Sequence, residues 1–348
     1  MMAFSISPLL VAILTVFHFG PVAAATGDIN LCGQSDHWNS TEVPYSFNNN
    51  AWGNDSSGYQ CMAVHDGGRS FDVTYKWTGE ASLVKGFPYL KAHPARLPVQ
   101  LWNVSRLQFT ANWRTYVSGK ENASPEEQAR AFDEISLHSN VAVDMFLSDD
   151  ITNSTGLNAP FEIMIWPWWV PTVKPLGWAD STPDKDVVTI DGTPFSLYHG
   201  WNDGGQHVFS WLSRKNLTKT DADYSPLLKY IWKKGLLSGA LYLGQLELGT
   251  EIKHAGAEVR FEVNNYNLSI VRQGDPEDVV TKTTSTRLST SSSASTSTTT
   301  AALTTVPSEM LVSATTTSTP TSTNAASPTG LMDLMPWPLA LAAIIYNH

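Results

Sequence analysis

The 348-residue sequence has few cysteines, a shortage of basic residues and no long apolar run. Without a run of about 20 apolar residues, a transmembrane helix is disfavoured. The 22 lysines and arginines are outnumbered by 32 acidic residues, and the net charge of -10 argues against a nucleic-acid partner. His199 and His207 have no metal-ligand spacing with other ligands, so we expect neither a metal nor a cofactor. No internal repeat is visible.

The amino-terminal end has the pattern of a secretory signal. The apolar stretch from Pro8 to Phe19 is too short to span a membrane comfortably, and the small residues Ala23–Ala25 follow it. We therefore expect residues 1–25 to be a signal peptide that is cut near Ala25. Seven Asn-x-Ser/Thr sequons fit a secreted glycoprotein. They begin at Asn39, Asn54, Asn103, Asn122, Asn153, Asn216 and Asn267.

The carboxy-terminal end indicates a tether. Residues 275–323 are dominated by Ser and Thr and cannot bury enough apolar area to fold, so we expect a disordered, O-glycosylated stalk. In residues 324–348, small residues, a polar spacer and the apolar Leu339–Tyr346 resemble a GPI-anchor attachment signal. The alternative is a plain secreted tail. The sequence thus predicts an extracellular protein, secreted or anchored to the cell surface through a glycolipid.

The remaining residues, 26–274, are predicted to form one all-β domain. Short runs rich in Val, Ile, Tyr, Phe and Trp are separated by Gly, Asn, Asp and Pro. One helix is predicted at Ser225–Trp232, with Ser225 as N-cap, Pro226 in its first turn and Gly235 beyond its end. A second helix start at Ser124–Glu127 is interpreted as part of a loop. The predicted strands are Ser70–Trp77, Leu107–Tyr116, Asn140–Leu147, Phe161–Trp166, Val187–Ile190, Gln206–Leu212 and Val259–Val271.

The two cysteines, Cys32 and Cys61, are predicted to form one disulfide. An even number of cysteines in a secreted protein favours pairing over two unpaired thiols. The bridge would close the N-terminal strands over about 30 residues, and we expect Cα atoms about 5.5 Å apart.

Two glutamates stand out because of where they lie. Glu162 belongs to the apolar strand Phe161–Trp166, where Glu162, Met164 and Trp166 share one face. A carboxylate on such a strand is costly unless it is paired or functional. Glu251 follows a second apolar strand that ends in Gly249-Thr250. Two acids on facing strands beside aromatic rings are the arrangement that glycoside hydrolysis requires.

Four segments give the chain a specific resemblance. They are Phe47–Gly53, Asn140–Phe146, Glu162–Trp166 and Gly249–Glu251. In order and spacing they resemble glycoside hydrolase family 12, the endo-β-1,4-glucanases and xyloglucanases, over nearly all of residues 31–271. The resemblance implies a two-sheet, concanavalin-like β-jelly-roll sandwich with one short helix packed on it and a disordered tail after it.

The resemblance also implies roles for individual residues. Glu162 would be the nucleophile and Glu251 the acid/base of a retaining mechanism, with carboxyl groups about 5 to 6 Å apart. Glu162 would be ionised and Glu251 protonated at working pH. Asp144 would support Glu162, by a hydrogen bond or by like charge, unless it faces solvent at a strand edge. Sugar-binding residues would be Asn50, Trp52, Met164 and Trp166, although both tryptophans would also suit a core.

The chain departs from the family pattern at three places. Ile252-Lys253 follows Glu251 where the family usually has Pro-Phe, and Glu247 stands where Gln is common. Pro167 is expected to interrupt the strand directly after Trp166. These changes keep both carboxylates but leave product-side contacts and substrate preference open.

Three functions are compatible with these observations. The first is a monomeric retaining endo-β-1,4-glucanase acting on xyloglucan, cellulose or mixed-linkage glucan. The second is a cell-wall glucan transglycosylase, since a sugar hydroxyl can intercept the same glycosyl-enzyme. The third is a non-catalytic carbohydrate-binding wall protein, which would keep the tryptophans but would not need both acids.

Overall fold

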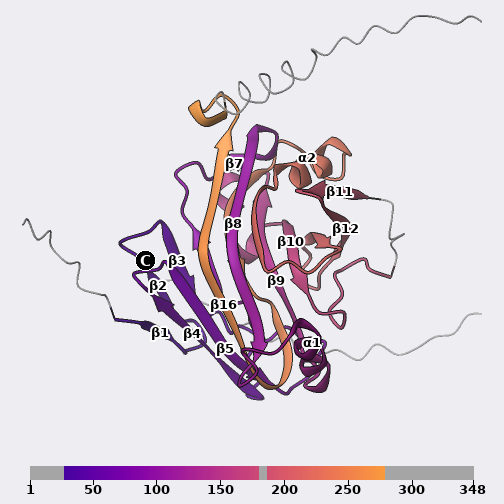
Figure 1. The fold of residues 1–348 in the computed structure, drawn as a ribbon. Coiled ribbons are helices and arrows are strands. Elements are labelled where there is room, and N and C mark those ends of the chain that lie inside the picture. Colours follow the sequence, from indigo (N-terminus) through magenta and orange to yellow (C-terminus); the bar gives the residue numbers. More distant parts are fainter. Residues whose placement is uncertain (1–26, 180–185, 279–348) are drawn as a thin grey trace, which may run out of the picture. The chain divides into compact units, whose positions relative to one another are not determined.

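The structure is a computed structural model that describes residues 27–179 and 186–278, and these form two β-sheets (Figure 1). The expected signal peptide, nearly all of the expected stalk and the anchor signal lie outside the described residues. Sheet A has the order β1 (Ile29–Leu31), β4 (Gly58–His65), β5 (Ser70–Trp77), β16 (Ile252–Arg272), β8 (Val104–Val117), β14 (Lys219–Asp223).

Sheet B is the larger sheet and carries Glu162 and Asp144. Its order is β2 (His37–Asn39), β3 (Tyr45–Asn48), β6 (Tyr89–Ala92), β15 (Tyr242–Gly249), β9 (His138–Ser148), β10 (Phe161–Trp169), β13 (His207–Ser213), β12 (Thr193–Trp201), β11 (Val187–Ile190). The short β7 (Val99–Gln100) pairs with the start of β15. All strand pairings in sheet B are antiparallel except that of β10 with β13.

The core lies between the inner faces of the two sheets. From sheet A, Tyr75 and Phe261 are fully buried, and from sheet B, Ile163, Phe209 and Leu248 are fully buried. Because side chains alternate along a strand, burying Ile163 on the inner face of β10 turns Glu162 and Met164 to the outer face of sheet B. The predicted two-sheet, all-β fold is confirmed.

Strand β16 connects the two sheets. Its first residues pair with β9, where Ile252 lies opposite Ser139, and the rest of the strand runs between β5 and β8 in sheet A (Figure 1). The strand is bulged at Asn264-Asn265, since the register with β8 shifts between Asn264 and Asn267, and Asn265 has a φ of 50°. The chain thus passes from sheet B to sheet A between His254 and Ala255, a few residues after Glu251.

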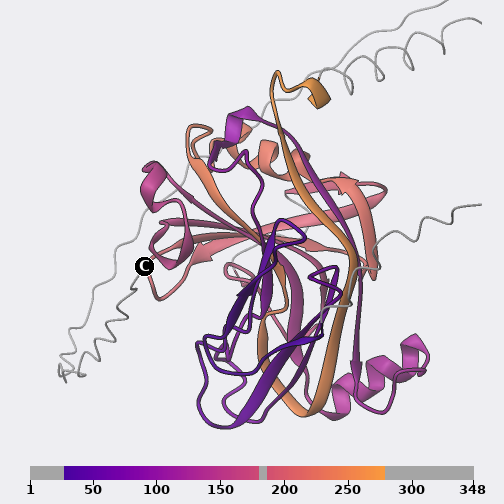
Figure 2. The same ribbon diagram turned by 90° about the vertical axis from the view of Figure 1, so that its left-hand side faces the viewer.

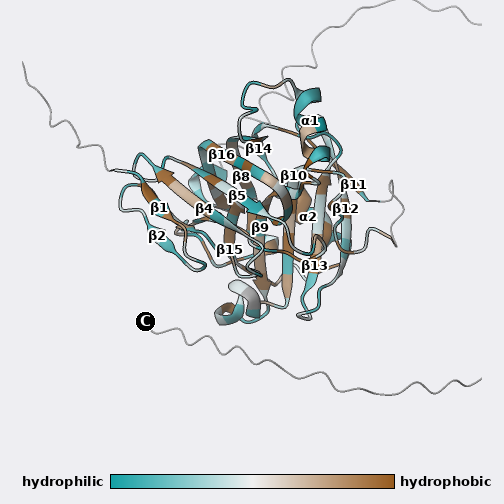
Figure 3. Cartoon of the chain, turned by 90° about the horizontal axis from the view of Figure 1, so that it is seen from below, coloured by the Kyte–Doolittle hydropathy of each residue, from teal (hydrophilic) through white to brown (hydrophobic). Residues whose placement is uncertain are grey.

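Two α-helices pack on the sheets, one more than expected. α2 (Ser225–Lys233) is the predicted helix and buries Leu227, Leu228 and Ile231, although Ser225 is its first residue and not its N-cap. α1 (Pro125–Glu134) is a full helix where a loop was expected. Its Ser124–Glu127 capping box satisfies two free N–H groups, which stabilises a largely hydrophilic helix that buries only Ala131 (Figure 3). Short 3₁₀ turns span Leu101–Asn103, Ile151–Asn153 and Gly156–Asn158.

The predicted strands are found, but only β5 and β11 have the expected limits. β8, β9 and β13 differ by one to three residues, and β16 begins at Ile252 where Val259 was expected. β10 does not end at Trp166. It continues to Trp169 because Pro167 sits in a bulge, where its pairing with β9 shifts register between Ile165 and Trp168. Proline has no N–H for the ladder, and a bulge removes the need for one.

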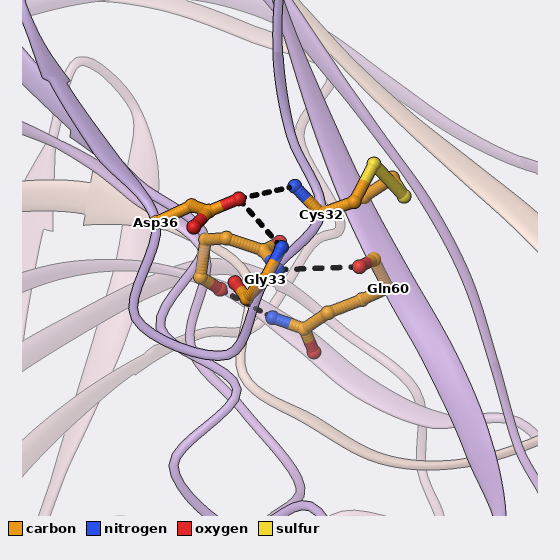
Figure 4. Close-up of a disulfide and its surroundings, with 6 residues drawn as sticks. Cys32, Gly33, Asp36 and Gln60 are labelled. Carbon is orange, nitrogen blue, oxygen red and sulfur yellow. Dashed lines mark hydrogen bonds between the residues drawn. A yellow bond between two sulfur atoms is a disulfide. The ribbon is translucent and has the colours of Figure 1, made fainter.

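The predicted disulfide is present. Cys32 and Cys61 are bonded with Cα atoms 4.2 Å apart, closer than the expected 5.5 Å and short of the 7 Å beyond which a bridge cannot form. Asp36 accepts hydrogen bonds from the N–H groups of Cys32 and Gly33, at 3.1 and 2.6 Å (Figure 4). The bridge therefore fixes the turn after β1 to the second strand of sheet A.

The described domain continues slightly beyond the expected limit of residue 274. Arg96 forms ion pairs with Asp275 and Glu277, at 2.7 and 2.8 Å, and the buried Asp278 accepts hydrogen bonds from Ser105 and from the N–H of Gly274. This turn and α1 lie at opposite ends of the long β8–β16 pair (Figure 2). Within the described residues, no helix is long and apolar enough to cross a membrane.

Candidate active site

A row of polar side chains crosses the outer face of sheet B. Strand pairing places Lys91 of β6 opposite Glu247 of β15, Glu247 opposite Asp144 of β9, and Asp144 opposite Met164 of β10. Directly opposed residues share a face and lie side by side. Glu162 is two residues before Met164 and therefore sits diagonally beside Asp144. Carboxyl groups from three adjacent strands thus gather at one place.

Glu251 approaches this row from the corner between β15 and β16. A Cβ on Gly249 would lie 2.4 Å from the carbonyl oxygen of Pro88, so only glycine allows the two backbones to come this close. Thr250 is fully buried; its N–H donates to that carbonyl at 3.3 Å and its hydroxyl donates to the carbonyl of Asn140. The Gly-Thr pair fixes the backbone from which Glu251 projects.

Asn140 then fixes the Glu251 side chain itself. Its Nδ2 donates to Glu251 Oε2 at 2.8 Å, and its Oδ1 accepts from the Glu251 N–H at 3.2 Å. Asn140 is fully buried at the start of β9. The sequence motif Asn140–Phe146 contains this residue but predicts no role for it. Asn140 and Asp144 are four residues apart on one strand, so both side chains lie on the same face, and this spacing is the sequence signal that points to Asn140.

Burial and neighbouring charge shift the pKa of Glu162. The pKa of Glu162 is raised to about 7, mainly because burial removes its hydration and to a smaller extent because Glu251 is negatively charged. A hydrogen bond with the Asp144 side chain lowers this pKa. The charge of Glu251 thus reaches both Glu162 and Asp144, which places Glu251 near the acidic row. This raised pKa differs from the expectation that Glu162 is ionised. The hydrogen bond with Asp144 is the interaction that favours the ionised form of Glu162.

Asp144 holds its proton more firmly than an ordinary aspartate. It is 5 % exposed, and burial together with the charges of Glu162 and Glu247 raises its pKa well above the usual range. Asp144 is therefore the hydrogen-bond donor to Glu162, and this bond favours the carboxylate form of Glu162. The expectation that Asp144 lies on the strand next to Glu162 is confirmed, and the alternative of an exposed edge residue is wrong.

The expected sugar-binding residues differ in accessibility. Trp52 is 54 % exposed, whereas Trp166 and Met164 are 3 % and 8 % exposed. Asn50 already uses its side-chain amide to donate to the carbonyl of Phe87 at 3.1 Å. The ring of Trp52 is therefore accessible for stacking, whereas Trp166 is buried in sheet B.

Trp52 lies on the Glu251 side of the row. The strand-like segment 85–88 bonds on one side to the Trp52 loop, through Gly53 N–H to Lys85 at 3.0 Å. On its other side it bonds to Ile252, whose N–H donates to Gly86 at 2.9 Å. No group of three or more His, Cys, Asp or Glu that could hold a metal ion occurs in the described ranges.

The family model that describes Glycosyl hydrolase family 12 matches residues 43–271. This span includes both glutamates, Asp144 and Asn140. The chain belongs to glycoside hydrolase family 12. The fold agrees, because the crystal structure of Trichoderma harzianum endoglucanase 3, from the same family, aligns with a TM-score of 0.58 at 24% identity, over 71% of this chain and all of that one.

Relatives of this family 12 chain include an enzyme and a protein named inactive from one organism. The xyloglucan-specific endo-beta-1,4-glucanase 1 of Phytophthora nicotianae is 30% identical over 264 residues, which is 72% of this chain and 97% of that protein. The inactive glycoside hydrolase XLP1 of the same species is 28% identical over 258 residues, which is 72% of this chain and 94% of that protein. Overall sequence identity therefore does not distinguish an active enzyme from an inactive relative. That distinction has to come from the residues of the site.

Proposed function

We propose that this family 12 protein is a retaining endo-β-1,4-glucanase that cleaves internal bonds of a β-glucan. The observation that carries the proposal is the placement of Glu162 beside Asp144 on the outer face of sheet B, with Glu251 fixed by Asn140 at the adjoining corner and near enough for its charge to act on Glu162. A retaining glycosidase needs two carboxyl groups with different tasks on either side of the scissile bond. A protein that only binds glucan has no need to bring these two acids together.

The proposed mechanism assigns one task to each acid. Asp144 keeps its proton and donates to Glu162, so that Glu162 attacks the anomeric carbon as a carboxylate. The bond from that carbon to the leaving oxygen breaks while Glu251 gives the oxygen its proton. In the second half, Glu251 takes a proton from water, and the water oxygen displaces Glu162 with net retention. Asn140 holds Glu251 in position through both halves.

Xyloglucan is the substrate that we propose first. The Phytophthora nicotianae relative is named for it, and the open ring of Trp52 suits the apolar face of a sugar. We further propose that the protein acts outside the cell, as a monomer. The extracellular location is supported by the seven sequons, because six of their asparagines are exposed and Asn103 is half-buried. The glycolipid anchor remains part of this proposal on sequence grounds.

The test compares the purified glycoprotein with its Glu162→Gln and Glu251→Gln variants on xyloglucan, cellulose and mixed-linkage glucan. We expect shorter oligosaccharides whose new reducing ends first appear in the β configuration by proton NMR. Each variant should lose activity by a factor on the order of 10³ or more. Glu126→Gln, an exposed change on α1, is the matched control. Formation of α products first would contradict retention.

A second candidate function is glucan binding without turnover. It is considered because one relative is named an inactive glycoside hydrolase. It predicts that the wild-type protein binds xyloglucan in affinity electrophoresis but releases no sugar, and that Glu162→Gln binds equally well. Longer products after addition of a xyloglucan oligosaccharide acceptor would instead identify transglycosylation.

A further inference from the structure

A third glutamate, Glu247, belongs to the same row of polar side chains as Asp144. Glu247 is 2 % exposed and stands between Lys91 on one neighbouring strand and Asp144 on the other. A buried carboxylate is costly unless it is paired, so its surroundings show which protonation state the fold accepts.

The hydrogen bonds around Glu247 fix its partner. Gln245 Oε1 accepts from Lys91 Nζ at 3.0 Å and from the N–H of Gly156 at 3.1 Å. These two donors settle the orientation of the Gln245 amide, whose Nε2 then donates to Glu247 Oε1. The ammonium group of Lys91 is thus bound to the amide oxygen, and a neutral amide stands between this cation and the Glu247 carboxyl.

On its other side, Glu247 faces Asp144, whose Oδ1 is buried and has no hydrogen-bond donor in the described residues. An acceptor buried without a donor costs about 1–3 kcal/mol. The titratable groups that face this place are Lys91 and Tyr89 from β6, Glu162 from β10, and Glu251 from the β15–β16 corner. A proton on Glu247 would supply the missing donor and remove one negative charge from the cluster.

We propose that Glu247 is a positioning residue that works in its neutral form, its O–H group supporting Asp144 and, through Asp144, the orientation of Glu162. The inference rests on the proposed function for its effect on turnover, but its protonation state can be measured separately. Burial raises the pKa of Glu247 to about 8, against the opposing effects of Lys91, Gln245 and Tyr89. Glu247 therefore stays neutral through the acid range and ionises in mildly alkaline solution.

The first experiment measures kcat/KM against pH for the wild type, Glu247→Gln and Glu247→Leu. Glutamine keeps the size and a donor group and cannot ionise, whereas leucine has neither donor nor charge. We expect the alkaline limb of Glu247→Gln to move to higher pH, and Glu247→Leu to lose about tenfold or more in kcat relative to Glu247→Gln. Glu126→Gln should leave the profile in place. Coincident limbs for wild type and Glu247→Gln, or equal kcat for the two variants, would overturn the proposal.

The second experiment does not depend on activity. Difference infrared spectra of wild type minus Glu247→Gln, in the acid range and again above the Glu247 pKa, should show the carbonyl stretch of a protonated carboxylic acid that disappears at high pH. Wild type minus Glu126→Gln is the control for a Glu-to-Gln change at an exposed position. A carboxylate band for Glu247 in the acid range would refute the neutral form, even if no glucan is ever cleaved. Conversely, an inactive wild type with the expected spectrum would refute only the proposed function.

Discussion

Asn140 binds Glu251 twice, at 2.8 Å through its amide nitrogen and at 3.2 Å through its amide oxygen. One buried side chain thereby controls both the backbone and the carboxyl group of the proposed acid/base. Such a double contact removes rotamer freedom from Glu251, and a displacement of about 1 Å in a reacting group can cost about a hundredfold in rate.

Replacing Asn140 should therefore affect turnover more than stability. We expect Asn140→Ala to lower kcat by about 10–100-fold, because Glu251 keeps its chemistry but loses its position. Asn264→Ala, an exposed change on β16, is the control and should retain wild-type kcat. Steady-state kinetics with a soluble xyloglucan, beside thermal unfolding, will separate the two effects. A larger rise in KM than fall in kcat would argue that Asn140 contacts substrate instead.

The stability of the domain should fall as the pH rises from acid to mildly alkaline. Glu162 and Glu247 have pKa values of about 7 and about 8 in the folded state, above those of the unfolded chain. The folded state therefore holds protons that the unfolded state releases, so this stabilisation is complete below about pH 4.5 and is lost through pH 7 to 8. Each pKa unit corresponds to about 1.4 kcal/mol, so the rise from the ordinary value to about 7 gives an effect on the order of 3 kcal/mol for Glu162 alone.

Thermal unfolding across that range will test the sign. We expect Tm to decrease from about pH 5 to pH 8, and the decrease to be smaller in Glu162→Gln, since glutamine does not titrate. Glu126→Gln should follow the wild-type curve. A Tm that rises with pH over this window would mean that these carboxyls are ionised in the folded protein.

Gly249 should not tolerate a side chain. In Gly249→Ala the new Cβ would meet the Pro88 carbonyl oxygen at 2.4 Å and Tyr89 Cβ at 2.9 Å, and both belong to the neighbouring β6 segment. We expect a loss of about 1–3 kcal/mol in the free energy of unfolding, with reduced kcat because Glu251 follows two residues later. Gly27→Ala has open space around its Cβ and is the matched control. Unfolding in urea measures the difference, and equal midpoints for the two variants would contradict the tight approach.

The end of the catalytic domain can be placed by truncation. A protein of residues 26–278 keeps the contacts of Arg96 with Asp275 and Glu277, and those of Ser105 with Asp278. A protein of residues 26–274 loses all of them. We expect the longer form to match the full-length chain in Tm and turnover, and the shorter one to melt at lower temperature. Equal Tm values would show that the last turn contributes nothing to stability.

Much of this fold could be predicted from local sequence. β5 and β11 were placed correctly because β-branched and aromatic residues are bounded by turn residues, and alternation alone put Glu162 and Met164 on one face. α1 was missed because its apolar stripe is poor, although its capping box was visible. Pro167 was interpreted as the end of a strand because a bulge depends on how the neighbouring strand pairs.

The supporting residues of the site could not be predicted in the same way. Lys91 and Gln245 are 154 positions apart, and Asn140 and Glu251 are 111 apart. Only strand pairing brings such residues together, and no local pattern encodes the register of distant strands. Glu247 was noticed as an unusual acid, but its burial and its place beside Asp144 follow from the order of β6, β15 and β9.

The passage from β15 into β16 has one more consequence. Glu162 is carried by the middle of sheet B, whereas Glu251 is carried by the corner where the chain leaves that sheet for the other. Because Asn140 of β9 binds Glu251 and the first residues of β16 still pair with β9, this one strand supports both acids. A shift of β9 would alter the separation of the two carboxyl groups without changing either residue.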